Sequence, residues 1–492
     1  MRRLSSIAAI AVGLLSFAPN QYADVIDNRG TEFFLGFMQN YTGTPNLVLF
    51  ITGPTATTGT VAVPGLSFTV PFTVTPGAIT SVPIPAGAEA IGSNAIDNKG
   101  VHVTSLAPVT VYGLNQIPFT TDAYLALPAT LLGTDHIVLG YKGGLGGPSE
   151  FQVVAAQDNT QVTITPSQAA LGRPAGIPFT ITLNQLQTFE LQGNDGTSGG
   201  IDLSGTKITS TKPIALFGGA VCTNIPSTAF VACDHVVEQI PATGTWGQNY
   251  LTVPLATRTG GDIFRVIARD DGTVVKINGA TVATLNRAQI FETSLSSSSF
   301  NVVTTSGPSL LAQYSKGTSA DGVTSDPFMM LIQPTEQFEN SYTVTTPAAS
   351  PVAFTNFLNI VAKSSETSSC LLDGAAVAGY TAIGASGYSG VHVPISIGTH
   401  NVSCPSGAGL YTYGFASADS YGYPGGLGLK FISTPRCDVN NNHVIDAADV
   451  QLIFAARNLP ASGPEDPRDA DGDLTITVLD ARICQLRIGQ AQ

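Results

Sequence analysis

The sequence predicts a mostly β protein, in which serial antiparallel β-sandwich-like repeats precede a small α-helical C-terminal domain with two calcium loops. Short alternating apolar segments, bounded by Gly, Pro, Asn and Asp, fill residues 24–435 without a helical period. Similar segments recur there about every hundred residues, which indicates a repeated unit. Residues 436–492 then carry two twelve-residue loops rich in acidic and amide side chains.

The N-terminus has the order of residues typical of a signal peptide. Two arginines near the start precede a mostly apolar run from Leu4 to Ala18, and polar residues continue through Ala23. We therefore expect residues 1–23 to be removed on export, which makes the mature chain secreted or attached at the cell surface. No later stretch approaches the roughly 20 apolar residues of a spanning helix, so we expect no transmembrane segment in the mature chain.

The low content of charged residues and the negative net charge limit the kinds of partner that we expect. Only 11% of the 492 residues are charged, and the net charge is −13. Soluble domains usually carry about a quarter charged residues, so this composition is typical of a secreted β protein. Because no basic patch is present, we expect neither a nucleic acid nor an anionic membrane as partner.

The six cysteines fall into three pairs that are local in sequence. Export into an oxidising environment makes disulfide formation the default, so we expect three bridges. The predicted pairs are Cys222 with Cys233, Cys370 with Cys404, and Cys437 with Cys484. Six free buried thiols are the alternative.

Three elements recur in the same order along residues 24–435. The first is a strand, a polar turn and a return strand, and it begins at Leu47, Phe151, Phe264 and Phe357. The second begins at Gly100, Gly205 and Gly398 and contains a proline that suits a turn or a sheet edge. The third runs from Asp122 to Pro128, from Asp234 to Pro241 and from Asp326 to Pro334.

This recurrence predicts three full units and a truncated fourth, each a small antiparallel sandwich. The expected boundaries are residues 30–145, 146–258, 259–350 and 351–430.

Several of these segments resemble a known family. Gly30 to Tyr41, Phe217 to Cys222, Ala232 to Pro241 and Thr245-Trp246-Gly247 are similar to the N-terminal region of IgG Fc-binding proteins. The similarity extends roughly from Gly30 to Gly426, and the Cys-x10-Cys-Asp-His segment is its most specific part. It implies an extracellular binding or adhesion region without a catalytic role. We expect the ligand to be an extracellular protein or glycan. The similarity does not imply that antibody is bound.

The same segment allows a different interpretation. Asp234, His235 and Glu238 are close in sequence and chemically suited to a metal or catalytic cluster. The alternation of side chains along a strand argues against that cluster, and structural roles are the simpler explanation.

Each C-terminal loop has the spacing by which twelve residues wrap one Ca²⁺, so we expect two ions. The first loop offers Asp438, Asn440, Asn442, the carbonyl of Val444, Asp446 and Asp449. The second begins 31 residues later (438 to 469) and offers Asp469, Asp471, Asp473, the carbonyl of Thr475, Thr477 and Asp480. These hard oxygen donors favour Ca²⁺ over Zn²⁺. Loops that cap helices without metal are the alternative.

A helix of about ten residues is expected after each loop, from Ala447 to Arg457 and from Val478 to Leu486. With Asp at position 12, this pair of loops resembles a dockerin type I module of the EF-hand type. The resemblance implies a cohesin-like partner, contacted through loop positions 10 and 11, and a bacterial source. Two departures weaken it: position 6 lacks the usual Gly, and the contact positions are the apolar pairs Ala447-Ala448 and Val478-Leu479. An intramolecular or unknown partner is therefore equally open.

Three functions fit these features. The preferred one is a secreted or cell-surface binding or adhesion protein that is not an enzyme. The first alternative is a catalytic or non-catalytic component of a cellulosome-like, polysaccharide-degrading assembly, and the second is a structural surface protein. The chain has no G-x-S-x-G or H-E-x-x-H motif and only six His, which argues against catalysis.

Overall fold

β-strands dominate the computed structural model, which describes residues 28–347, 353–428, 437–440, 445–461, 466–470 and 475–488. The strands form four antiparallel sheets of seven or eight strands each, so the mostly β prediction is confirmed. The predicted signal peptide lies outside the described residues. Within these ranges, no helix has the length and apolar content needed to cross a membrane.

Each sheet corresponds to one unit of chain. Unit 1 contains β1 (Gly30–Leu35), β2 (Asn46–Thr52), β3 (Thr57–Val63), β4 (Phe68–Val74), β5 (Thr80–Ile84), β7 (Val101–Ile117) and β8 (Thr120–Leu125). Unit 2 contains β9 (Gly133–Ile137), β10 (Ser149–Ala155), β11 (Thr160–Thr165), β12 (Phe179–Leu183), β13 (Thr188–Gln192), β14 (Lys207–Thr223) and β15 (Asp234–Ile240), and it is joined by β6 (Ala95–Asp97).

The other two units repeat this order. Unit 3 contains β16 (Gly247–Thr252), β17 (Asp262–Ala268), β18 (Thr273–Ile277), β19 (Ala280–Leu285), β20 (Ile290–Leu295), β21 (Asn301–Tyr314) and β22 (Met329–Ile332). Unit 4 contains β23 (Glu339–Thr345), β24 (Thr355–Lys363), β25 (Leu371–Leu372), β26 (Ala375–Ala376), β27 (Thr381–Ala382), β28 (Tyr388–Ile395), β29 (Thr399–Ala416) and β30 (Asp419–Pro424). Its sheet has eight strands, so the expectation of a truncated fourth unit is wrong.

One long strand organises each unit: β7, β14, β21 or β29. Its first half pairs with one group of strands and its second half with another, and the register shifts between the two halves. A proline lies at or next to each shift: Pro108, Pro213, Pro308 or Pro405. A bulge leaves backbone groups without a ladder partner, so the missing N–H of proline costs little there.

The structure corrects two sequence predictions about these strands. The recurring prolines lie inside one continuous strand and not in a turn between two strands. The first recurring element is also not a hairpin, because β10 and β11 do not pair with each other. Both pair with β14, on its two different halves. The polar turn between them therefore crosses from one half of the folded sheet to the other.

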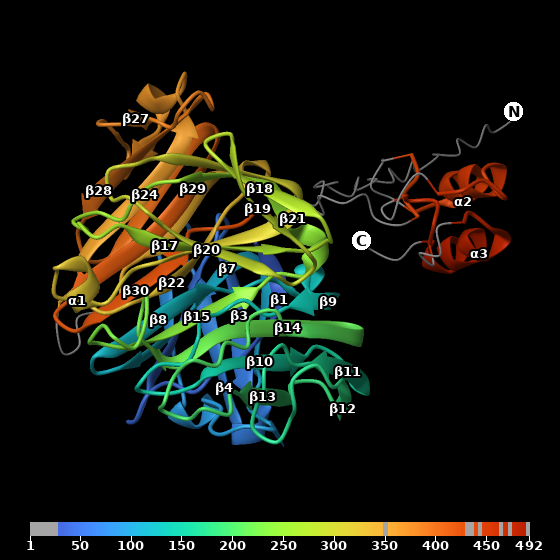
Figure 1. Ribbon diagram of the computed structural model, residues 1–492, viewed down its shortest axis with the longest axis horizontal. Coiled ribbons are helices and arrows are strands. Elements are labelled where there is room, and N and C mark those ends of the chain that lie inside the picture. The colour runs from blue at the N-terminus through green and yellow to red at the C-terminus, as the bar shows by residue number, and fades with distance from the viewer. Residues whose placement is uncertain are drawn as a thin grey trace, which may run out of the picture.

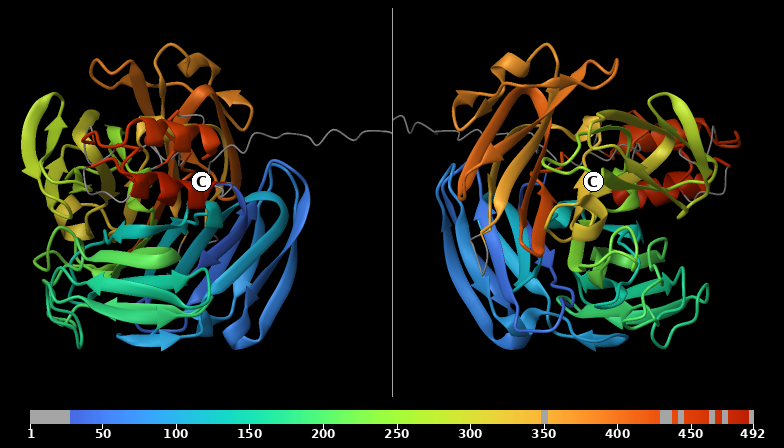
Figure 2. Two further views of the ribbon diagram at one scale, coloured as in Figure 1. Left: turned by 90° about the vertical axis from the view of Figure 1, so that its right-hand side faces the viewer. Right: turned by 60° about the vertical axis from the view of Figure 1, so that its left-hand side comes forward.

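The four units close into a ring. Figure 2 shows them in chain order around a centre, with unit 1 in blue, unit 2 in teal and green, unit 3 in yellow and unit 4 in orange. Strand β8 contacts both β15 and β30, and β22 contacts both β15 and β30. The last strand of every unit therefore lies at the centre, and unit 4 packs against unit 1.

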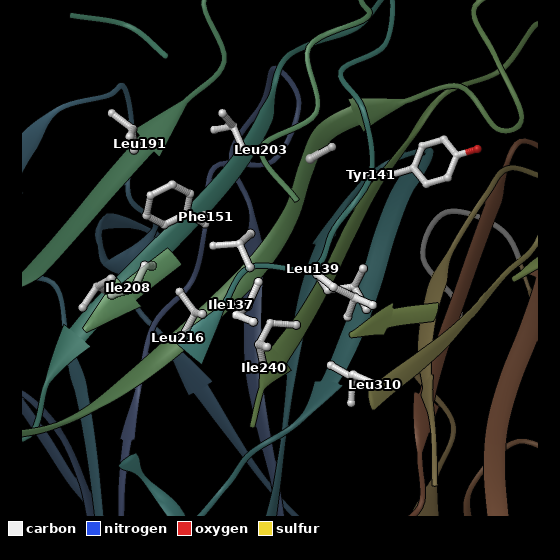
Figure 3. Packing of buried hydrophobic residues seen from close by; sticks show 14 of the residues in the cluster. Ile137, Leu139, Tyr141, Phe151, Leu191, Leu203, Ile208, Leu216, Ile240 and Leu310 are labelled. Atoms are coloured by element: carbon white, nitrogen blue, oxygen red, sulfur yellow. The ribbon is translucent and has the colours of Figure 1, made fainter. Parts of the chain in front are cut away.

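Apolar cores lie within the units and also across their junctions. One core joins Tyr141 and Phe151 of unit 2 to Leu310 of unit 3, as Figure 3 shows. Further buried clusters join unit 1 to unit 2, unit 3 to unit 4, and unit 4 back to unit 1. Because every unit shares a core with both neighbours, the ring is expected to fold as one body.

Helical structure is concentrated near the C-terminus, apart from the short α1 (Thr318–Asp321) and several 3-10 turns. Helices α2 (Ala447–Ala455) and α3 (Val478–Arg487) lie beside each other in Figure 1 and share a small core with Ile453, Ile476 and Cys484. Both begin with a capping box, in which the N-cap side chain and the side chain three residues later bond reciprocally to the backbone.

Candidate functional site

Asp122 lies at the centre of the ring and joins all four units. Its carboxyl Oδ1 accepts hydrogen bonds from the backbone N–H of Ala123 (2.9 Å) and Gly422 (3.2 Å). Its Oδ2 accepts from the N–H of Val237 (3.0 Å) and Met329 (3.3 Å). These donors come from units 1, 4, 2 and 3 in turn. The side chain that opens the third recurring sequence element is therefore a structural connector.

Three other aspartates near the start of a last strand gather around this point. The N–H of Thr121 donates to Asp234, and the Thr121 hydroxyl donates to Asp419, so both carboxyls contact one residue. Burial raises the pKa of Asp234 well above its usual range, and the neighbouring carboxyls of Asp419, Asp326 and Asp122 add to the shift. Burial also raises the pKa of Asp419 and of Asp326 to about 7. The centre is thus a set of buried carboxyls whose pKa values are all raised.

The structure separates Asp234, His235 and Glu238, the three residues of the alternative cluster. Asp234 bonds to Thr121, His235 Nδ1 lies 3.0 Å from the carbonyl oxygen of Ala220, and Glu238 accepts from the N–H of Leu331 at 3.0 Å. Burial lowers the pKa of His235 to about 4, so the imidazole is neutral. Each side chain therefore has its own partner in the fold, and the hypothesis of a metal or catalytic cluster receives no support from this geometry.

The predicted calcium loops are described in part. Asn442, Val444, Asp471 and Asp473 lie outside the described residues. The other predicted ligands are described: Asp438, Asn440, Asp446, Asp449, Asp469, Thr475, Thr477 and Asp480. The aspartates at positions 1 and 12 of both loops are fully buried. No group of three His, Cys, Asp or Glu side chains among the described residues is already arranged to hold a metal ion.

In both loops, the carboxylate at position 12 accepts hydrogen bonds from backbone N–H groups of the same loop. Asp449 accepts from the N–H of Val439 (2.9 Å), Asn440 (3.1 Å) and Asp446 (3.0 Å). Asp480 accepts from the N–H of Ala470 (2.7 Å) and Thr477 (2.7 Å) in the second loop. Each loop start is therefore held next to the carboxylate that closes the loop. The oxygen chemistry of the buried residues fits Ca²⁺.

The structure contains three disulfides, and the predicted pairings are confirmed. They join Cys222 to Cys233, Cys370 to Cys404, and Cys437 to Cys484, and no cysteine of the described chain is free. The first closes the connection between β14 and β15. The third ties the start of the first predicted calcium loop to α3.

A cleft of about 270 Å³ lies at the junction of units 1 and 4. Its lining includes Arg29, Tyr112, Glu339, Tyr342 and Asn401, a largely polar set. Tyr112 donates to the carbonyl of Gly425 across this junction, so the cleft lies where the ring closes. Sequence analysis missed this site because its residues come from opposite ends of the β region and share no local pattern.

The closed β ring and its three disulfides define the class as a disulfide-containing, mostly β protein. The family model described as IgGFc binding protein matches residues 122–414. A human IgGFc-binding protein is 28% identical to the chain over 436 residues, which are 84% of this chain and 8% of the human protein. The chain therefore belongs to the IgGFc binding protein family, and it spans less than a tenth of the length of that relative.

Proposed function

We propose that the protein is a secreted or cell-surface binding and adhesion protein, and that residues 436–492 form a dockerin-like module that binds two Ca²⁺ ions. Membership of the IgGFc binding protein family supports the proposed binding and adhesion function. Three disulfides suit an oxidising extracellular location. We do not assign a reaction to the chain, and its ligand is an extracellular protein or glycan.

The polar cleft between units 1 and 4 is the candidate contact for that ligand. Arg29 and Glu339 contribute charged groups to its lining and Asn401 contributes an amide, whereas Tyr112 and Tyr342 are almost fully buried. Ligand sites use a few placed polar groups of this kind to fix orientation and specificity. Arg29→Ala with Asn401→Ala is expected to weaken retention on immobilised extracellular glycoproteins at least several-fold, while an exposed variant on unit 2, Asp158→Ala, should bind as the wild type does.

The calcium proposal rests on the two loops. Asp438, Asn440, Asn442, Val444, Asp446 and Asp449 would hold one ion, and Asp469, Asp471, Asp473, Thr475, Thr477 and Asp480 would hold the other. Burial of the position-1 and position-12 aspartates supports it, because a cation offsets the cost of burying several carboxylates in one small domain. Thr477 has the weakest claim as a direct ligand, since its hydroxyl accepts from the Leu479 N–H as helix cap.

Calcium titration of the full chain by calorimetry tests the module. The wild type and the variant Asp438→Ala with Asp469→Ala are compared in calcium-free buffer. The variant should lose two saturable sites, because each substitution removes a position-1 carboxylate. Equal binding by both proteins would overturn the calcium proposal and leave the binding function of the ring untouched.

One observation supports the second candidate, a component of a cellulosome-like assembly. The position 10 and 11 residues are exposed, one pair at the start of each helix: Ala447 and Ala448 in α2, and Val478 and Leu479 in α3. Exposed apolar pairs on a small domain suit docking to a cohesin-like partner. Retention of the full chain on an immobilised cohesin in calcium, and its loss in Leu479→Asp, would support this candidate; equal behaviour with and without the substitution would remove it.

A further inference from the structure

Units 1 and 2 meet over a group of three buried glutamates. Strand β6 lies between β5 and β7 of unit 1 in the sequence and pairs with β13 at the edge of the unit 2 sheet, and a parallel β-bridge joins Phe37 to Glu89. Glu89, Glu150 and Glu190 are 4%, 0% and 5% exposed. Three carboxyls buried at one junction require protons or a cation to offset their mutual repulsion.

Three oxygen atoms at this junction converge on a single point. Gln192 Nε2 lies 3.0 Å from Glu150 Oε2, 3.2 Å from Glu190 Oε1 and 3.1 Å from Gln39 Oε1. An amide nitrogen has two hydrogens, so it cannot satisfy three acceptors. The other carboxyl oxygens, Glu150 Oε1 and Glu190 Oε2, are buried without a hydrogen-bond partner. The Gly92 N–H also donates to Gln39 Oε1 at 2.8 Å, so the oxygens of Glu150 and Glu190 are the ones that the donors at this junction do not fully serve.

The charge of Lys99 acts on the carboxyls of Glu89 and Glu190, but the direct contacts of its ammonium group are with other atoms. Its Nζ donates to the backbone carbonyl of Glu89 at 2.9 Å and lies 3.8 Å from Asp97 Oδ2. The Glu89 carboxyl accepts from the N–H of Asn40 at 2.9 Å. These contacts leave Glu150 and Glu190 without an ion pair of their own in the described structure.

Unit 3 provides an internal comparison. In unit 2, Gln152 and Glu190 are register partners on β10 and β13. The corresponding partners on β17 and β20 of unit 3 are Arg265 and Glu292, which form an ion pair at 2.8 Å. Unit 3 therefore supplies a guanidinium to the glutamate of its strand pair, whereas unit 2 has a neutral glutamine at that position and a further carboxyl, Glu150, beside it.

We propose that one Ca²⁺ ion binds at the junction of units 1 and 2, held by the carboxylates of Glu150 and Glu190 and the amide oxygen of Gln39. A half-turn of the Gln192 amide adds its oxygen to the set. The donors are all hard oxygens, which favours Ca²⁺ over Zn²⁺. Mg²⁺ is disfavoured because it retains several waters and demands a tighter octahedron than a buried junction of carboxyl and carboxamide groups provides.

The bound ion links unit 1 to unit 2, because its ligands come from both units. Gln39 belongs to unit 1, whereas Glu150, Glu190 and Gln192 belong to unit 2. Calcium therefore stabilises this junction of the ring, and this site is separate from the two loops in residues 436–492.

The test counts calcium ions on the full chain by equilibrium dialysis at pH 8. Wild type should hold three ions, Glu150→Gln with Glu190→Gln should hold two, and Asp438→Ala with Asp469→Ala should hold one. If the C-terminal module fails to bind, the wild type holds one ion and the glutamate variant none, so the two proposals are distinguished. Calcium should also raise the midpoint of thermal unfolding of the ring in the wild type but not in the glutamate variant.

Glu292→Gln is the matched control. It removes a glutamate at the corresponding position of unit 3, where Arg265 keeps its second partner Asp202 at 2.8 Å, and it should hold as many ions as the wild type. Near-UV circular dichroism checks that each variant keeps its buried aromatic packing. The inference is overturned if the glutamate variant is folded and binds as many ions as the wild type. It is also overturned if calcium leaves the ring unchanged and the variant alters only its pH dependence, which would mean a shared proton only.

Discussion

Asp122 illustrates how one side chain can connect four repeats. A single carboxyl group accepts four backbone N–H groups, one from each unit, in a region closed to water. A buried N–H that loses its acceptor costs about 1–3 kcal/mol, so the contribution of such a residue is far larger than that of a surface carboxylate.

Replacing this residue tests its role. Asp122→Ala is expected to lower the free energy of unfolding by about 3 kcal/mol or more, because it leaves four buried donors without their acceptor. Chemical denaturation followed by tyrosine fluorescence measures the loss. Asp158→Ala, at an exposed turn, should change stability by less than about 1 kcal/mol. A loss of similar size in both variants would contradict the connecting role.

The pKa of Asp419 predicts the sign of a pH effect. Its folded pKa of about 7 lies above the ordinary 3.8, so the folded ring binds more protons than the unfolded chain between these values. The stability from this group is fully present below about pH 4 and is lost as pH rises through 7. In calcium-free buffer, Asp419→Asn should therefore lose less stability than the wild type between pH 5 and 8.

Thermal unfolding at several pH values measures this difference. An exposed substitution that removes no titratable group, Gln157→Ala, should leave the wild-type pH profile unchanged. Parallel profiles for the wild type and Asp419→Asn would show that the carboxyl is not protonated in the folded ring.

At the scale of elements, glycine residues allow the long strand of a unit to pair closely with the last strand of that unit. Strand β14 carries Gly219 where it pairs closely with β15, and a Cβ added there would lie 1.8 Å from the carbonyl oxygen of Val236. Gly113 of β7 is similarly close to the Tyr124 ring. Glycine is needed here for close approach of neighbouring chains and not for an unusual backbone angle.

Gly219→Ala should destabilise the ring by about 3 kcal/mol, because the backbone of β15 must move to accept the methyl group. Gly87→Ala is the matched control, since its added Cβ would meet only Leu66 Cδ1 at 3.5 Å, an ordinary contact. Urea denaturation of both variants measures the difference. Equal stability of the two variants would show that the β14–β15 approach can relax.

At the scale of the whole molecule, ring closure distinguishes this protein from an open array. In an open repeat array, each unit contacts only its neighbours in sequence, and a terminal unit adds a fixed increment of stability. Here Val48, Phe50 and Tyr112 of unit 1 share a buried cluster with Tyr342, Leu358 and Leu410 of unit 4. Unit 1 therefore depends on a unit more than 200 residues away in sequence.

Truncation tests this dependence. A chain that ends at residue 338 lacks unit 4 and exposes the apolar surfaces of units 1 and 3, so it should aggregate or lose cooperative unfolding. A chain that ends at residue 436 keeps the ring and should unfold in one transition. Size-exclusion chromatography and calorimetry compare the two. A monomeric, cooperatively folded 338-residue chain would contradict closure as a condition for folding.

The sequence by itself determined the features that local patterns encode. Alternating apolar segments and turn residues identified a β protein, and recurring elements identified a unit of about a hundred residues. Local cysteine spacing identified all three disulfides, and loop spacing identified the candidate calcium ligands. Each signal is read from stretches of a few tens of residues. Over such short stretches, the order of residues in the chain largely determines where their side chains lie.

Only the tertiary structure decided which parts meet. Asp122 and Gly422 bond across 300 residues, and Gln39 and Gln192 meet across 153. No periodicity records such contacts, because they depend on how four sheets bend at their bulges and close around a common centre. The recurring aspartates could therefore be recognised in the sequence only as a pattern. Their roles, Asp122 as the buried connector and the other aspartates as its neighbouring carboxyls, depend on the closed ring.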